Sequence, residues 1–346
     1  MEIAADITFH PRWWHEKAGV DFDRKFFWDP DYRIEADRAM RRELFRRFGD
    51  VGLGDKDPAP RPILGSDLIA SGFLFSEILG CDILYTPADP PEVLCRNLED
   101  EEVADLKLPH LEECLLWQDT LKQAAYLEAK YGYVESHINL QGVQNIALDL
   151  RGTELFIDYY IRPELARKLL EICTELMLAA GKVLRQHSRF LSHGVTSITR
   201  LVMPEVYVTS NCTVEMVSLQ IYEEFLLPCD ARLAEVFRPF GIHHCGKTME
   251  HVVAGYAKLC PEFAEVGAFS DIRAVREALP ETFLNLRYSP VRLKDITKDE
   301  LAADIQEMLE AGGPTGRVSI SCVGIDHMVE DDRVKEFMVL ARRSKQ

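Results

Sequence analysis

The feature that most constrains this chain is a regular alternation of short apolar segments with amphipathic ones after residue 132. Strand-like segments are predicted at residues 133–140, 205–210, 241–244, 263–267, 283–287 and 317–321, and the later ones alternate with helices at 248–259, 271–279, 297–311 and 329–342. Such alternation is typical of right-handed βαβ units, whose strands form a parallel sheet. We therefore predict an α/β protein, a (β/α)8 TIM barrel with an N-terminal helical and aromatic extension. An open doubly wound sheet is the alternative, but no GxGxxG or P-loop motif supports a nucleotide fold.

The first 62 residues differ in composition from the rest. They are rich in aromatic side chains, among them Trp13, Trp14 and Trp28, and residues 34–48 show the spacing of an amphipathic helix before a Gly/Pro-rich loop. We predict that residues 1–62 form an extension packed on the barrel and that residues 63–346 form the barrel as a single catalytic domain. The aromatic side chains fit either a packed cap or the wall of a pocket for a planar, apolar substrate.

The sequence FGIHHCGK, residues 240–247, places His243 and Cys245 two residues apart at the end of a predicted strand. Residues i and i+2 of a strand point to the same side, so these two side chains project together. An imidazole nitrogen with a thiolate is a donor set typical of zinc. The neighbouring His244 is expected to face the helices instead. Each residue also has an ordinary role open to it, as a core histidine or as a small buried hydrophobic side chain.

A third candidate ligand lies far away in the sequence. Cys322 follows the predicted strand at 317–321, and 76 residues separate it from Cys245. A β/α barrel gathers the carboxyl ends of its strands at one mouth, which would bring the two cysteines together. Three protein ligands with a fourth position open are the pattern of a catalytic zinc ion. The predicted metal ligands are therefore His243, Cys245 and Cys322, which are also the predicted catalytic residues.

Other polar residues follow predicted strand ends and are candidates for contact with substrate. Amides can cap loops and an arginine can form a structural ion pair, so each also has a purely structural interpretation. The candidates are Asn145, Asn211, Cys212, Arg287 and Tyr288.

Composition excludes several classes of partner. The net charge is −17, with 57 acidic and 40 basic residues, which argues against nucleic acid and anionic membranes. No apolar run reaches the length of about 20 residues that spans a bilayer, and the first residues do not form a signal peptide. The nine cysteines are scattered without a CxxC pair, so we expect reduced thiols and a cytoplasmic protein.

The pattern His243-x-Cys245-Gly246 with the later Cys322 resembles the zinc motif of corrinoid-dependent methyltransferases in the uroporphyrinogen decarboxylase superfamily. The resemblance is strongest from about residue 130 onward and includes residues 216–237, which resemble the family's helix before the His-x-Cys strand. It implies a (β/α)8 barrel, a zinc ion held by the His and both Cys, and a corrinoid protein that docks over the mouth.

Two departures from the superfamily pattern shape the functional prediction. Residues 12–21, RWWHEKAGVD, do not match the arginine-bearing motif of the decarboxylases, so decarboxylation is not expected. Relatives that methylate a thiol carry a glutamate on the strand after His-x-Cys; here the matching position is Gly267, and Glu265 is not expected to point inward.

The resemblance and these departures lead to one preferred reaction and two alternatives. We predict methyl transfer from a small methylated substrate, such as an aryl methyl ether, to the cobalt of a corrinoid protein, with zinc as Lewis acid. The alternatives are a methyl-corrinoid:thiol methyltransferase and, in another class, a non-catalytic barrel that binds a ligand or partner.

Overall fold

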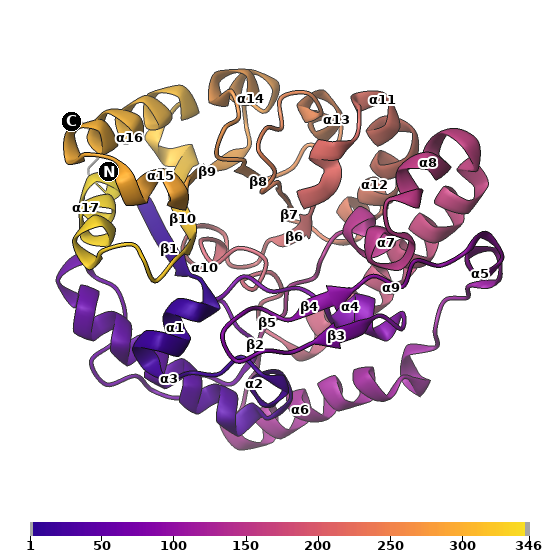
Figure 1. The fold of residues 1–346 in the computed structure, drawn as a ribbon, viewed down its shortest axis with the longest axis horizontal. Helices are drawn as coiled ribbons and strands as arrows, with labels where there is room; N and C mark the ends of the chain where they lie inside the picture. The colour runs from indigo at the N-terminus through magenta and orange to yellow at the C-terminus, as the bar shows by residue number, and fades with distance from the viewer. Residues whose placement is uncertain (1–2, 343–346) are drawn as a thin grey trace.

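The strand-like segments of the second half form one parallel sheet in the structure, a computed structural model that describes residues 3–342 (Figure 1). Six strands pair in the order β1-β10-β9-β8-β7-β6, and every pairing is parallel. Their bounds are β1 Ala4–Phe9, β6 Tyr207–Ser210, β7 Phe240–His243, β8 Phe263–Val266, β9 Phe283–Tyr288 and β10 Val318–Ile325. Two smaller pairs complete the strands: β2 (Ile63–Gly65) with β5 (Glu135–His137) is parallel, and β3 (Asp82–Leu84) with β4 (Glu92–Leu94) is antiparallel.

Helices surround the strands, with α12 to α17 outside the six-stranded sheet and α3 and α6 along the opposite edge of the molecule (Figure 1). The first nine are α1 Pro11–Ala18, α2 Arg24–Trp28, α3 Pro30–Phe48, α4 Leu74–Ile78, α5 Asp100–Asp105, α6 Leu115–Tyr131, α7 Val143–Arg151, α8 Glu154–Ile161 and α9 Pro163–His187. The others are α10 Thr199–Val202, α11 Leu219–Ile221, α12 Leu227–Val236, α13 Val253–Ala257, α14 Ile272–Ala278, α15 Pro290–Asp295, α16 Lys298–Gly312 and α17 Asp331–Arg342. Within the described residues, no helix is both long and apolar enough to cross a bilayer.

Local sequence explains where several helices begin. Asp29 accepts hydrogen bonds from the first turn of α3 and precedes Pro30, and Thr297 forms a capping box with Glu300 at the start of α16. The helix predicted from residue 248 is shorter than expected, because α13 begins only at Val253. Thr248 does not cap it; its backbone carbonyl instead accepts a hydrogen bond from the His244 ring.

Closure of the sheet into a full (β/α)8 barrel is not confirmed. Across residues 3–342, no strand ladder joins β1 to β2 or β5 to β6. The strands β2 and β5 have three residues each, and irregular chain lies beside β5, where the backbone N–H of Arg189 bonds the carbonyl of Val134. The short strands β2 and β5 therefore form a separate pair and do not join β1 to β6 into a closed sheet.

The N-terminal segment contributes the strand β1 to the main sheet. Ala4 to Phe9 pair in parallel with β10, with Asp6 opposite Ser321 and Thr8 opposite Val323. The alternating sequence AADITF was overlooked because the aromatic residues after it dominate the composition. Residues 1–2 of the predicted extension and residues 343–346 of the predicted barrel lie outside the described residues.

The aromatic residues near the N-terminus are mostly core. Phe9, at the end of β1, stacks on Trp13 with ring centroids 4.0 Å apart, and Phe48 at the end of α3 also stacks on Phe9. Trp13 and Trp14 are each only 1% exposed, and the indole N–H of Trp14 donates to the carbonyl of Leu68 at 3.1 Å. For these side chains the packed-cap interpretation is correct.

Candidate metal centre

The carboxyl ends of the adjacent strands β6 and β7 bring Cys212, His243 and Cys245 together. Ser210 of β6 is in register with His243 of β7, which is in register with Glu265 of β8. Cys212 follows Ser210 by two residues and Cys245 follows His243 by two, so both leave their strands at the same edge. One ligand atom from each of Cys212, His243 and Cys245 lies within 4.8 Å of the others.

Cys322 lies elsewhere, which corrects the predicted ligand set. In the ladder between β9 and β10, Ser321 is opposite Arg287 and Cys322 is opposite Tyr288. Tyr288 faces the helices, where its hydroxyl donates to Asp304 at 2.7 Å. Cys322 shares that face and is a fully buried member of the hydrophobic core. The physical reason is that β10 runs on to Ile325, so Cys322 is a mid-strand residue.

Glu265 points inward and holds His243, contrary to the expectation from the sequence. One of its carboxylate oxygens lies 2.6 Å from Nδ1 of His243, and the other lies 3.4 Å from Nε of Arg287. Burial by itself lowers the pKa of His243, but the Glu265 carboxylate and the Cys245 thiol outweigh it and raise the pKa to about 10. Burial likewise raises the pKa of Glu265, while His243 and Arg287 hold it below its ordinary value.

The arrangement of Glu265 and His243 fits a metal ligand and its orienting partner. Metal-binding histidines commonly give their second ring nitrogen to a carboxylate. Because Nδ1 of His243 faces Glu265, Nε2 is the ring nitrogen left for a metal. The second carboxylate oxygen, Oε1, is buried and has no hydrogen-bond partner among the described residues.

The two thiols are electrostatically coupled. Contact with Cys245 lowers the pKa of Cys212 to about 7, whereas contact with Cys212 raises the pKa of Cys245. The cluster therefore holds a negative charge readily at one sulfur near neutral pH. Zinc bonds of about 2.0 Å to nitrogen and 2.3 Å to sulfur place tetrahedral ligand atoms roughly 3.3–3.8 Å apart. Ligand atoms within 4.8 Å of one another reach that spacing by small side-chain adjustments.

A cavity of about 520 Å³ opens beside this cluster. Its volume is in the range of small-molecule sites, about 300–1,000 Å³. Cys212, His243, Cys245, Glu265 and Arg287 form one side of the wall, and we call these five residues the metal-side cluster. The arrangement can hold a metal ion next to a small bound molecule.

The residues proposed for substrate contact divide into two groups. Asn145, Cys212 and Arg287 line the cavity, and Asn145 accepts a 2.7 Å hydrogen bond from the hydroxyl of Thr213 beside Cys212. Asn211 and Tyr288 do not line it. Asn211 donates to the buried Asp230 at 2.7 Å, and Tyr288 bonds Asp304 in the helix layer. Both side chains therefore form structural hydrogen bonds and do not contact the cavity beside the metal-side cluster.

His244 faces away from the cavity, as strand parity predicts. Its Nε2 donates to the carbonyl of Thr248 at 2.9 Å, so Nδ1 accepts from the hydroxyl of Tyr256 at 2.9 Å. Burial lowers the pKa of His244 to about 4, which keeps the ring neutral. Two successive histidines thus have opposite environments.

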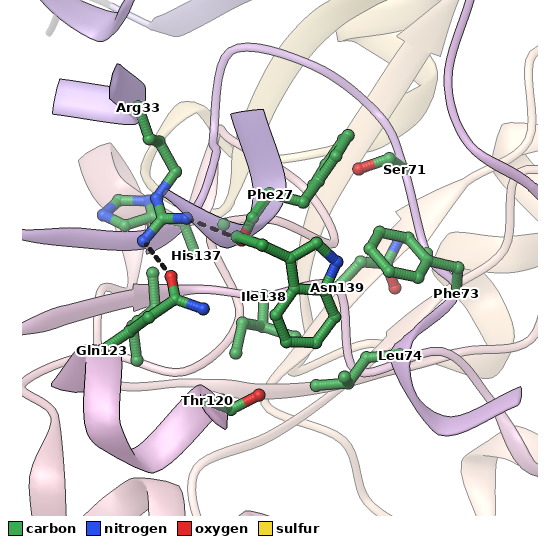
Figure 2. A pocket seen from close by; sticks show the side chains of 14 residues that line it. Phe27, Arg33, Ser71, Phe73, Leu74, Thr120, Gln123, His137, Ile138 and Asn139 are labelled. Atoms are coloured by element: carbon green, nitrogen blue, oxygen red, sulfur yellow. Dashed lines mark hydrogen bonds between the residues drawn. The ribbon is translucent and has the colours of Figure 1, made fainter. Parts of the chain in front are cut away.

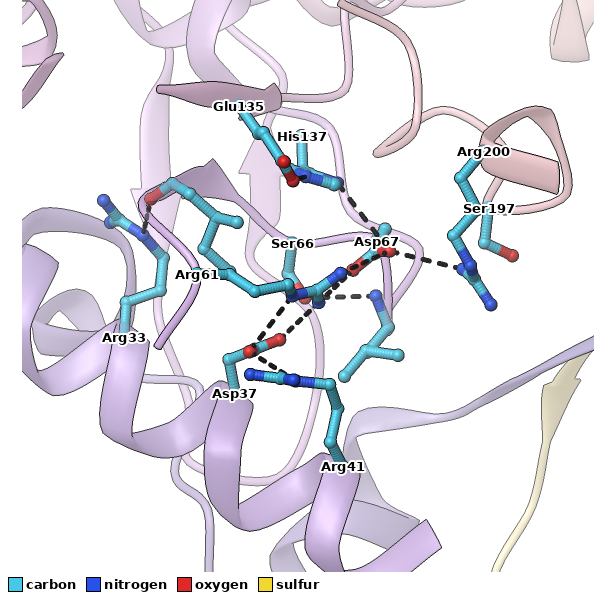
Figure 3. Close-up of polar contacts among 12 residues, drawn as sticks. Arg33, Asp37, Arg41, Arg61, Ser66, Asp67, Glu135, His137, Ser197 and Arg200 are labelled. Atoms are coloured by element: carbon cyan, nitrogen blue, oxygen red, sulfur yellow. Dashed lines mark hydrogen bonds and ion pairs between the residues drawn. The ribbon is translucent and has the colours of Figure 1, made fainter. Parts of the chain in front are cut away.

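The sequence prediction missed a second polar cluster on the cavity wall. Asp67 accepts hydrogen bonds from Arg61 and Arg200, at 2.8 Å and 3.3 Å (Figure 3). Arg61 also bonds Asp37, and Arg200 donates to Asp6 at 2.7 Å. We call Asp6, Asp37, Arg61, Asp67 and Arg200 the arginine network. The available signal was Ser66-Asp67 directly after the strand β2, at a strand end like the others.

A separate, smaller cavity of about 50 Å³ is lined in part by aromatic side chains of residues 1–62. Phe27, Trp28 and Phe73 form its walls, and Gln123 and Thr120 lie at one end (Figure 2). By comparison, an engineered protein cavity that binds benzene has a volume of about 150 Å³. This space is therefore too small for an aromatic ring as it stands, although it adjoins the larger cavity through Ser71, Gly72 and Asn139.

The fold is similar to that of a solved structure with a very different sequence. A methyltransferase from Methanosarcina mazei superposes with a TM-score of 0.68 at 15% identity, covering 98% of this chain and 93% of that one. A B12-independent methionine synthase from Shewanella sp. W3-18-1, in complex with selenomethionine, gives a TM-score of 0.49 at 12% identity, covering 98% and 96%. No protein-family model and no curated protein matches the sequence. At such low identity the first likeness establishes the fold alone.

Proposed function

We propose that this protein is a zinc-dependent methyltransferase that moves a methyl group between a small substrate and the cobalt of a corrinoid protein. The observation that carries the proposal is the grouping of Cys212, His243 and Cys245 within 4.8 Å on the wall of a cavity of substrate size. The shared fold of the Methanosarcina mazei methyltransferase supports it. A non-catalytic binding barrel has less support, because ligand binding alone does not require two thiols and an imidazole grouped as metal ligands.

The donor set fits zinc, and His243, Cys245 and Cys212 would hold it. The ion would supply Lewis acidity toward a substrate heteroatom and leave a fourth position open. Glu265 fixes the orientation of the His243 ring, and Arg287 in turn holds Glu265. The cavity wall would hold the substrate with its methyl group aligned for transfer.

The preferred direction is demethylation of an aryl methyl ether. Bound to a Lewis acid, the ether oxygen becomes a better leaving group as the methyl carbon is attacked. The ring would occupy the larger cavity, because the small aromatic cavity cannot admit it. Cobalt(I) of the partner corrinoid would be the nucleophile.

Thiol methylation is a second candidate, and the position of Glu265 favours it. This glutamate points inward and contacts His243, whereas the sequence argument against thiol methylation assumed that no glutamate lies at the site. Two sulfur ligands also make a soft site, which suits a substrate thiol. The two candidates share the ligands and differ in the substrate.

A partner protein has apolar surface available near the predicted mouth. Met216, Phe269 and Met328 follow the ends of β6, β8 and β10 and are 60%, 63% and 56% exposed. Exposed large apolar side chains at the same end of a sheet are candidates for a protein-binding surface. We propose that the corrinoid protein docks on these loops.

The test combines metal analysis with a methyl-transfer assay. Protein produced with ample zinc should contain one zinc ion per chain, and His243→Ala should lose both the metal and the activity, while His244→Ala keeps the metal. Transfer is followed by the cobalt absorbance of a corrinoid protein with methyl ethers, and separately with methyl-cobalamin and free thiols. Absence of zinc would overturn the metal assignment. Activity only with thiols would select the second candidate.

A further inference from the structure

The charges on the cavity wall are not evenly balanced. Three carboxylates line it, Asp67, Asp149 and Glu265, against one guanidinium, Arg287, and the imidazoles of His193 and His243. Asp67 is paired with Arg61 and Arg200 from behind the wall, and Glu265 is paired with His243 and Arg287. Asp149 forms no ion pair with any described residue.

The hydrogen bonds of Asp149 come only from neutral groups. Its Oδ2 accepts from the Ser76 hydroxyl at 2.6 Å and from the Gln141 amide at 3.4 Å. Burial raises the pKa of Asp149 to about 6, these two hydrogen bonds offset part of that effect, and no cation contributes. No hydrogen bond of the described residues ends on the other oxygen, Oδ1. The carboxylate is thus held in position with capacity for another partner.

Resting on the proposed function, we propose that Asp149 recognises a protonated primary or secondary amine on the substrate. A carboxylate that carries no counter-ion favours an N–H cation over a neutral or anionic group. The cavity wall contains no Phe, Tyr or Trp, so it lacks the aromatic cage that quaternary ammonium groups require. The single lining guanidinium is already engaged by Glu265, which disfavours a substrate carboxylate.

The helix α7 sets the distance between the amine and the reacting group. Asn145 contacts Thr213, the residue after Cys212, and Asp149 lies four residues further along the same face of α7. Side chains at this spacing are about 5–6 Å apart. The amine would therefore lie roughly one helical turn from the metal-side cluster. A methyl-bearing oxygen and an amine on a benzyl framework meet that separation.

The test uses three probes that share one methoxyphenyl ring and differ in charge: 3-methoxybenzylamine, 3-methoxybenzyl alcohol and 3-methoxybenzoate. Binding to the zinc-loaded protein is measured by calorimetry without a corrinoid partner. We expect the amine to bind roughly 10- to 100-fold more tightly than the alcohol, as for a hydrogen bond to a charged group, and the benzoate to bind weakest. In Asp149→Asn the amine should lose that advantage while the alcohol changes less than about twofold.

Two controls separate this proposal from its alternatives. Asp119→Asn removes a surface carboxylate of α6 and should leave all three affinities unchanged. The melting temperature of Asp149→Asn checks folding, since an amide oxygen can still accept from Ser76. Equal affinities for amine and alcohol, or an unaffected Asp149→Asn, would overturn the proposal.

The binding assay also distinguishes this proposal from the methyltransferase assignment. Amine binding through Asp149 without methyl transfer would leave the recognition site standing and remove the proposed reaction. Demethylation of the amine and the alcohol with equal efficiency would support the proposed reaction and remove the amine-recognition role of Asp149.

Discussion

Two buried polar clusters border the same cavity, and they differ in how completely their charges are satisfied. In the arginine network, Asp37 is bonded by Arg41 and Arg61, and Asp67 by Arg61 and Arg200 (Figure 3). In the metal-side cluster, one oxygen of Glu265 accepts no hydrogen bond among the described residues and has only the longer 3.4 Å contact with Arg287, and the thiols of Cys212 and Cys245 form no disulfide. Buried charge by itself therefore does not identify a functional site. Unused ligand capacity beside a cavity does, and this contrast can be tested by substitution in each cluster.

The largest effect on folding is expected in the arginine network. Arg61 bonds both Asp37 and Asp67, so Arg61→Ala leaves these two buried carboxylates with one cationic partner fewer each. Breaking a buried ion pair from one side costs about 3–5 kcal/mol. We expect that loss in the free energy of unfolding, measured with chemical denaturant, with zinc content per folded chain unchanged.

A surface arginine provides the matched control for this substitution. Arg46 pairs with Glu43 and is 62% exposed in its side chain, so Arg46→Ala should lower the free energy of unfolding far less than Arg61→Ala. Equal losses in Arg61→Ala and Arg46→Ala would mean that the arginine network is not a structural element. Loss of zinc in a folded Arg61→Ala protein would break the distinction between the two clusters.

The second prediction concerns which cysteine holds the metal. Cys212→Ser should weaken zinc binding more than about 100-fold, because even the hydrogen-bond partners of metal ligands contribute about 10- to 100-fold. Cys322→Ser should retain zinc and instead lose about 1–3 kcal/mol of stability from a buried hydroxyl. Competition with a chromogenic chelator measures the first effect and denaturation the second. The opposite pattern would restore the ligand set predicted from the sequence.

These cysteines also show how far the sequence could lead. Alternation predicted the strands from β6 onward, and a spacing of two predicted that His243 and Cys245 act together, because both follow from the geometry of a strand. The length of β10 could not be predicted, since SCVGI continues the strand without a turn signal strong enough to end it. Cys322 was therefore placed at a strand end when it lies inside the strand.

Register was the other missing piece of information. Ser210 pairs with His243, which sets Cys212 beside Cys245, but the offset between two strands depends on how the sheet twists and packs. Parity within one strand could have been used better. Glu265 and Gly267 are two residues apart and share a face, so an inward Gly267 already implied an inward Glu265.

The third prediction tests the role of Glu265 in orienting His243. Glu265→Gln keeps the shape but removes the charge that faces Nδ1 of the ring. We expect zinc affinity to fall about 10- to 100-fold with the protein still folded. The same chelator competition gives the value, and Glu262→Gln, at a partly exposed carboxylate on the amino-terminal side of β8, serves as the control. An unchanged affinity would show that Glu265 serves only to balance Arg287.

The smallest effect is expected at His244, a satisfied residue next to a predicted ligand. The ring is buried and neutral, with its pKa lowered to about 4, so the unfolded chain binds its proton first as the pH falls below about 6.5. Stability is therefore present above that pH and is lost as the pH falls toward 4. At pH 5.5 the loss from this ring is roughly 1–1.5 kcal/mol relative to pH 7.5.

His244→Gln should remove this contribution, in protein freed of zinc so that metal release does not enter. Other groups also titrate in this range: the pKa of His193, which burial lowers to about 4, acts in the same direction, whereas the pKa of His243, raised to about 10, acts in the opposite direction. The contribution of His244 is therefore the difference between the two proteins, and His244→Gln should lose roughly 1–1.5 kcal/mol less between pH 7.5 and 5.5. The comparison uses the change in unfolding free energy between pH 7.5 and 5.5, because the substitution also disturbs the bonds to Tyr256 and Thr248 at every pH. An identical pH dependence in both proteins would mean that His244 is charged when folded. A satisfied side chain would then resemble a functional one, and hydrogen-bond completeness would no longer separate the two kinds of cluster.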